Sequence, residues 1–180
     1  MNNKLLNKLL VFGFIIMATS SCERDDICAE TTPTTPHLII RFYDINNPEE
    51  FKQVRQLSIR GFDANDMEIE QEILAPVNTD SIVLPLRFDG EGIPTTSRFI
   101  LEKDRDFFLD TNPATVSNID MIKVNYTPEF VYVSRACGYK SIFTNTSITI
   151  VSDSENWIFS SEVINTTIEN ENQAHIILRH

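Results

Sequence analysis

The sequence is poor in glycine, histidine and positive charge, and these shortages exclude several classes of protein. It holds five glycines and three histidines, none of them in a HExxH, GxSxG, GxGxxG or P-loop motif. Fifteen Lys and Arg residues against 26 Asp and Glu give a net charge of −11. Phosphate binding needs clustered basic residues, so a nucleic-acid partner is not expected. We also expect no catalytic residues, no cofactor, no metal site and no enzymatic activity.

Long apolar runs are also missing, apart from one short run near the start. Leu9–Ala18 has ten residues without a charge, and Lys4 and Lys8 precede it. A membrane-spanning helix needs about 20 apolar residues, so the run is too short to cross a bilayer. A positive start followed by a short apolar core is typical of a signal peptide.

Cys22 follows this run after the small polar residues Thr19, Ser20 and Ser21. The segment resembles a lipobox, with Thr19 where most lipoboxes have Leu. We therefore expect residues 1–21 to be a lipoprotein signal peptide and Cys22 to carry the lipid. The alternative is an ordinary secretory signal with cleavage near Ser21.

A lipid at Cys22 would make the membrane a permanent partner. Each buried CH₂ contributes about 0.8 kcal/mol, and two or three acyl chains together hold a protein firmly. Glu23–Asp26 is acidic apart from Arg24 and resembles an export signal to the outer face of the outer membrane. We expect an outer-membrane lipoprotein, on either the periplasmic or the cell-surface face. Cleavage would remove two lysines and no acid, so the charge would become −13.

If Cys22 takes the lipid, Cys28 and Cys137 are left as a pair. Outside the cytoplasm such a pair is more often oxidised than free. The disulfide would close a loop that stabilises the fold by about 4–5 kcal/mol in the chain-entropy model. Two buried free thiols are the alternative.

The chain after the signal divides into a tether and one domain. Residues 22–36 are acidic and then rich in Thr and Pro, which predicts an extended tether. Residues 37–180 are expected to form one domain, in which His37–Asp44 and Asp80–Phe88 alternate apolar and polar side chains as half-buried strands do. Pro85 has no N–H, which predicts an edge or a bulge there.

The remaining segments also predict short strands rather than helices. Ile119–Gly138 is typical of a hairpin that turns at Thr127–Glu129, and Glu68–Leu74 predicts a weak edge strand. About nine short strands, with turns every 8–12 residues, indicate an all-β fold. We expect a two-sheet antiparallel sandwich of immunoglobulin-like type. The other expected strands are Glu50–Arg60, Ser97–Lys103, Ser141–Val151, Asn156–Ile164 and Ala174–Arg179.

Two segments carry a resemblance to a known family. Asp25-Asp26-Ile27-Cys28, and later VYVSRACGYKSIF with Cys137-Gly138-Tyr139, are similar to a family of uncharacterised lipoproteins from Bacteroidota. The likeness covers nearly the whole chain after the signal. The resemblance implies an envelope location and a structural pairing of Cys28 with Cys137, and it implies no activity.

Three weaker patterns mark candidate residues. Asp104, Asp106 and Asp110 provide oxygens suited to calcium, but the Gly and Glu of an EF-hand loop are missing. Asp80-Ser81-Ile82 resembles an O-glycosylation acceptor, which makes Ser81 a candidate. Exposed aromatic rings could stack on a sugar, although rings on strands are more often core. The rings in question are Tyr43, Tyr126, Tyr132, Tyr139 and Trp157.

Three functions are compatible with these patterns. The leading hypothesis is a non-enzymatic, lipid-anchored module that binds an unknown envelope protein or glycan, or has a structural role. The second is a carbohydrate-binding module of a glycan-uptake system, which requires coplanar exposed aromatics. The third is a hydrolase in which His37 or His175 meets carboxylates in a pocket.

Overall fold

A computed structural model describes residues 27–105 and 115–180. Its chain divides into two compact units. The described part of the first unit consists of residues 27–32 and Tyr132–Tyr139, and the second unit consists of Pro33–Val131 and Lys140–His180. The expected signal peptide and Cys22 lie outside the described residues.

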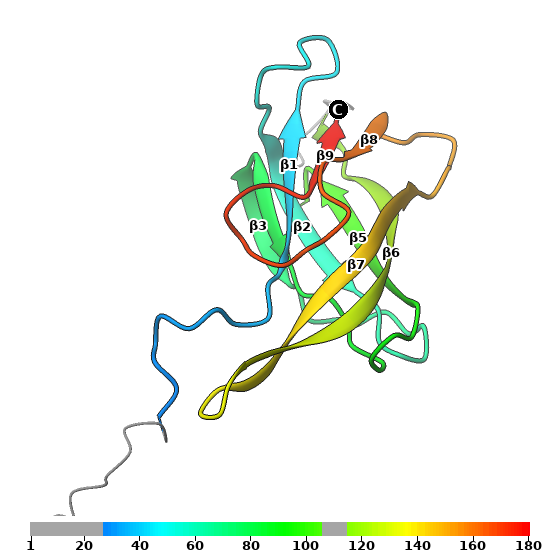
Figure 1. The fold of residues 1–180 in the computed structure, drawn as a ribbon. Coiled ribbons are helices and arrows are strands. Elements are labelled where there is room, and N and C mark those ends of the chain that lie inside the picture. Colours follow the sequence, from blue (N-terminus) through cyan, green and yellow to red (C-terminus); the bar gives the residue numbers. More distant parts are fainter. Residues whose placement is uncertain (1–26, 106–114) are drawn as a thin grey trace, which may run out of the picture. The chain divides into compact units, whose positions relative to one another are not determined.

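The described part of the chain is all β, as expected, with nine strands and no helix. A four-stranded sheet has the order β4-β1-β9-β8, and a five-stranded sheet has the order β3-β2-β5-β6-β7 (Figure 1). No helix in the described residues is long and apolar enough to span a membrane. The strands are β1 (Leu38–Tyr43), β2 (Val54–Gly61), β3 (Leu74–Thr79), β4 (Ser81–Leu84), β5 (Thr95–Lys103), β6 (Asn118–Ser134), β7 (Gly138–Ile150), β8 (Ser160–Val163) and β9 (Ile176–Arg179).

The two sheets share one apolar core, because alternate residues of each strand face inward. In β1, Leu38, Ile40 and Phe42 are fully buried, as the alternation predicted. Inward residues of the facing sheet meet them, among them Leu57 of β2 and Val124 of β6. This confirms the sandwich architecture.

One strand pair is parallel, although an antiparallel sandwich was expected. β1 pairs with β9 in parallel, with Ile40 opposite Ile176 and Phe42 opposite Leu178. Each of these strands also has an antiparallel neighbour on its other side, β4 and β8 respectively. The alternation of β1 and β9 is the same in either direction, so sequence periodicity could not distinguish the two arrangements.

The prediction of a turn at Thr127–Glu129 is wrong. β6 continues through these residues, and the hairpin turns between β6 and β7, whose long twisted ribbon is visible in Figure 1. Pairing of β6 with β5 ends at Thr95 opposite Tyr126, so Pro128 lies beyond the last pair. The Pro128 carbonyl accepts a hydrogen bond from Gly92 N at 2.8 Å. The missing N–H of Pro128 therefore costs no ladder hydrogen bond to β5.

Three other strand boundaries differ from the expectation. Glu68 makes only an isolated bridge with Phe62, and the edge strand follows later as β3. β4 ends at Leu84, directly before Pro85, rather than at Phe88, but it lies at an edge of its sheet, as Pro85 predicted. Phe159 precedes β8 and is 64% exposed, whereas Trp157 is buried.

Three groups close a ring of hydrogen bonds between the sheets. Tyr126 Oη donates to Arg87 O at 2.6 Å and lies 2.7 Å from Ser97 Oγ. Arg87 N donates to Ser97 Oγ at 3.2 Å. The hydroxyl proton of Tyr126 is donated to the Arg87 carbonyl, so in the second contact the hydroxyl of Ser97 donates to Tyr126 Oη. The ring attaches the segment after β4 to β5 and β6 of the other sheet.

Replacing Tyr126 with Phe should lower the free energy of unfolding by about 1–3 kcal/mol, because two buried partners lose a hydrogen bond. Burial raises the pKa of Tyr126 above 10.0, so its stabilisation is present below pH 10 and is lost as the pH rises further. Urea unfolding at pH 7.5 and above pH 10 measures both effects.

Tyr43→Phe is the control, because Tyr43 is only partly buried. Equal stability of Y126F and Y43F would contradict the role of the hydrogen-bonded ring.

Candidate functional site

The first unit is held by a disulfide between Cys28 and Cys137, whose Cα atoms are 4.8 Å apart. This confirms the expected pairing. Thr32 Oγ1 lies 3.6 Å from Cys137 Sγ, and Ser134 Oγ accepts a hydrogen bond from Cys137 N. Gly138 has a φ of +70°, a conformation that favours glycine where the turn leads into β7. The bridge thus ties the segment that follows Cys22 to the hairpin turn.

The five candidate rings, Tyr43, Tyr126, Tyr132, Tyr139 and Trp157, do not form a flat platform for a sugar. Tyr132 and Tyr139 are 55% and 66% exposed, but their ring planes are inclined at 69° with centroids 5.4 Å apart. Tyr126 and Trp157 belong to the core, and Tyr43 packs against Phe51. None of these five rings forms a coplanar exposed pair with another.

His175 has both ring nitrogens occupied by the backbone. Nδ1 accepts a hydrogen bond from Ile39 N at 3.0 Å, and Nε2 lies 2.9 Å from Asn170 O. Nε2 therefore carries the proton and the ring is neutral. Burial lowers the pKa of His175, against the smaller effects of the Asn170 hydrogen bond and Glu171. The ring connects two backbone segments and has no nitrogen left for proton transfer.

The other two histidines also make local structural contacts. His37 Nδ1 lies 2.7 Å from Glu171 Oε1, and both side chains are about half exposed. His180 packs edge-on against Phe42 and Trp157, and burial lowers its pKa. Neither arrangement is the pocket of histidine and carboxylates that a hydrolase requires.

The buried carboxylate of Glu102 lies on the outer face of the five-stranded sheet. It accepts hydrogen bonds from Arg60 at 3.0 Å, Arg105 at 2.6 Å and Ser117 at 2.9 Å. Burial raises the pKa of Glu102, but the hydrogen bonds from Arg105, Arg60 and Ser117 outweigh it and the pKa is lowered. Glu102 is an ionised acceptor with its oxygens occupied, rather than a general acid.

A second buried carboxylate, Asp120, faces the core. Its oxygens accept hydrogen bonds from Trp157 N at 3.3 Å and Ile158 N at 2.7 Å. Burial raises its pKa, against these hydrogen bonds. Asp120 thereby fixes a segment that lies in no strand. Sequence reasoning missed both Asp120 and Glu102, because alternation places polar residues on either face without showing which are buried.

A polar hollow of about 500 Å³ lies on the outer face of β5 and β6. It gathers three basic side chains, Arg87, Arg98 and Lys123, with the carboxylates of Asp66 and Asp89. The side chains come from two loops and two strands, so no local motif could have indicated the hollow. It is a candidate binding site within the second unit.

The residues proposed for metal binding or modification are only partly described. Asp104 is buried and pairs with Arg55, whereas Asp106 and Asp110 lie outside the described residues. Among the residues that the structure describes, no three His, Cys, Asp or Glu side chains are grouped to hold a metal ion. Ser81 lies at the start of β4, partly buried, with its N–H bonded to Thr79 Oγ1.

A family model for a family of unknown function, DUF6452, matches residues 56–180. The chain belongs to this family. The match includes Cys137 but begins after Cys28, so the Asp25–Cys28 segment that carried part of the resemblance lies outside it. No curated protein and no solved structure matches the chain. Membership in DUF6452 therefore assigns a family and no activity.

Replacing His175 with Gln should make stability less sensitive to acid. In the folded chain the pKa of His175 lies below the ordinary 6.5. Just below pH 6.5, His175 is therefore protonated in the unfolded chain and still neutral in the folded chain. The stability that neutral His175 contributes is present above pH 6.5 and is lost as the pH falls. Urea unfolding at pH 7.5 and pH 5 measures the slope.

The wild type should lose more stability than H175Q between these two values. His180 shifts in the same direction and remains in both proteins, so the difference isolates His175. Parallel pH profiles would contradict the assignment.

Removing the disulfide, as C28S with C137S, should lower the free energy of unfolding by about 4–5 kcal/mol, because the bridge spans a sequence separation of 109 residues. Guanidinium unfolding of the variant and of the wild type, with and without reductant, measures the loss. Reductant should bring the wild type to the level of the variant and leave the variant unchanged. A wild type that is indifferent to reductant would contradict this expectation.

Proposed function

We propose that this DUF6452 member is a non-enzymatic, lipid-anchored protein of the cell envelope that binds a partner there. The Cys28–Cys137 disulfide is the observation that carries the proposal. Structural disulfides persist in oxidising compartments outside the cytoplasm. Cys28 follows closely after Cys22, the expected lipid site, so the lipid and the disulfide would both be attached to the same short tether. The outer membrane remains the proposed location, with either face open.

The use of its ionisable groups supports a role other than catalysis. Catalytic acids and bases need a free position toward a substrate. In this chain the nitrogens of His175 and the carboxylates of Glu102 and Asp120 are directed to internal partners. Their pKa shifts follow from burial and from those partners. This pattern favours the binding module over the hydrolase.

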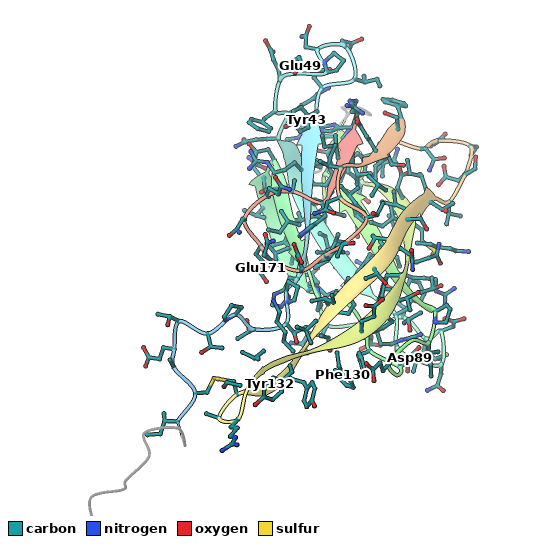
Figure 2. All side chains as sticks on the ribbon, in the orientation of Figure 1. Tyr43, Glu49, Asp89, Phe130, Tyr132 and Glu171 are labelled. Carbon is teal, nitrogen blue, oxygen red and sulfur yellow. A yellow bond between two sulfur atoms is a disulfide. The ribbon has the colours of Figure 1, made fainter. Side chains whose placement is uncertain are left out.

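An exposed aromatic pair supports binding of a protein partner. The rings of Phe88 and Phe130 are in contact, with centroids 4.9 Å apart and planes inclined at 33°, and the two residues are 39% and 45% exposed. Phe130 and Asp89 lie at the end of the sandwich opposite Tyr43 and Glu49 (Figure 2). Apolar surface that stays exposed on a folded protein is often an interaction site. The inclined pair Tyr132 and Tyr139 gives no comparable support to a carbohydrate-binding module.

The anchor is tested in the native host with the full chain and the variant C22S. The wild type should be recovered with the membranes, and mass spectrometry should find acyl chains on Cys22. C22S should be released, because the lipid supplies the attachment. C28S is the matched control: it also removes a cysteine near the tether, yet it should keep the lipid.

Partner binding is tested in the same cells with a photo-crosslinking residue in place of Phe130 or, as control, Val83. Val83 is 52% exposed on β4, in the other sheet. A reproducible product at position 130 and not at position 83 is expected. Unacylated Cys22 in the wild type would overturn the anchor, and equal products at both positions would overturn the binding surface.

A further inference from the structure

We propose that the hollow between Arg98 and Lys123 binds a small organic anion through its carboxylate or phosphate group. This inference goes beyond the envelope role and does not depend on the lipid anchor. The pairing of β5 with β6 places two positive charges next to each other on the outer face of the sheet. Arg98 of β5 and Lys123 of β6 are directly opposite each other in the antiparallel register.

Like charges directly opposite each other destabilise a sheet. The ammonium group of Lys123 makes no ion pair or hydrogen bond within the parts of the chain that the structure describes, 27–105 and 115–180. Arg98 is paired with Asp66, and its guanidinium carbon lies 4.5 Å from the centre of the Phe62 ring. The sheet thus holds one restrained and one unpaired cation side by side. An anion that reached both would relieve their repulsion.

Asp66 shows that a carboxylate fits against Arg98. Its side chain is 72% exposed, whereas that of Arg98 is 21% exposed. Asp66 has a φ of 64°, in a turn where Asp63 Oδ1 accepts hydrogen bonds from the N–H groups of Asn65 and Met67. The turn therefore presents one carboxylate to Arg98 from the solvent side. A ligand carboxylate could replace it without disturbing a buried group.

Arg87 has a different role, because its guanidinium is already used. It pairs with Asp89 and donates to Asp63 O at 3.1 Å, which attaches the turn at 63–67 to the segment after β4. Arg87 and Asp89 nearly cancel in charge. The uncompensated positive charge in the hollow is therefore that of Lys123.

Neighbouring polar groups suit the uncharged part of such a ligand. Thr96 Oγ1 donates to Asn125 Oδ1 at 2.7 Å, and the two residues are opposite each other in the next outward pair of the same strands. The amide NH₂ of Asn125 remains able to donate to a ligand. A hollow of about 500 Å³ has the size of small-molecule sites. The ligand class is therefore a small anion with hydroxyl groups.

The test is titration calorimetry of the full chain with D-galacturonate, D-glucose 6-phosphate, inorganic phosphate and the neutral methyl α-D-glucoside. At least one anion should bind saturably and more weakly at higher ionic strength, and the neutral sugar should not bind. Galacturonate and glucose 6-phosphate separate a carboxylate ligand from a phosphate ligand. Inorganic phosphate shows whether the hydroxylated part is needed.

Two variants should change the affinity in opposite directions. Lys123→Gln should weaken binding about tenfold, because a charge-assisted hydrogen bond is lost. Asp66→Asn should strengthen it about three- to tenfold, because the competing carboxylate is gone. Lys103→Gln is the matched control: it removes the same charge from β5, outside the hollow, and should leave the affinity unchanged.

No binding of any of the three anions to D66N would overturn the proposal, as would equal affinities of K123Q and K103Q. D66N alters an exposed side chain and is expected to fold, which unfolding in urea confirms. C22S should bind the anion as the wild type does. Failure of the lipid anchor and failure of this site are therefore distinguishable.

Discussion

The parallel pairing of β1 with β9 is the constraint on which the four-stranded sheet depends. β4 pairs only with β1 in that sheet, and β8 pairs only with β9. Without the central pair, two separate two-stranded ribbons would remain, and such ribbons are marginally stable alone. The contact is also anchored past the last paired residues, because His180 N donates to Tyr43 O and His180 O accepts from Ile45 N. The first and the last of the described strands must meet, so this sheet depends on a contact between segments that are far apart in the sequence, and such contacts slow folding.

Buried polar groups determine how the second sheet closes over the first. Apolar alternation determines which face of each sheet is buried, but it does not by itself determine how far one sheet is displaced over the other. Tyr126 of β6 hydrogen-bonds to Arg87 O in the segment after β4, and Asp120 of β6 hydrogen-bonds to the backbone at Trp157 and Ile158 in the segment before β8. Each of these side chains binds a backbone group in another segment of the chain. An unpaired buried group would cost more than a hydrogen bond gains, so each contact selects one arrangement.

Local patterns in the sequence were sufficient for the fold class and for part of the site. The alternation at His37–Asp44 and the cysteine count predicted β1 and the Cys28–Cys137 bridge correctly. Local patterns failed to predict features that depend on which strand lies next to a residue in the sheet. Pro128 indicates a turn when read alone. It is tolerated inside β6 because the pairing of β6 with β5 stops at Tyr126, so no residue of β5 lies opposite Pro128. The hollow was beyond prediction for the same reason, since the cross-strand register alone brings Arg98 to Lys123.

The same register explains how a strongly acidic chain can present a local site for an anion. Exposed charges further apart than a Debye length, about 8 Å at physiological ionic strength, are largely screened from each other, so the net charge of the chain has little effect inside the hollow. Within the hollow the nearest charges dominate, and there the sheet holds Arg98 and Lys123 together. A small anion would meet only the two cations and the Asp66 carboxylate that it displaces. The strand register therefore supplies the attraction for an anion, independently of the net charge of the whole chain.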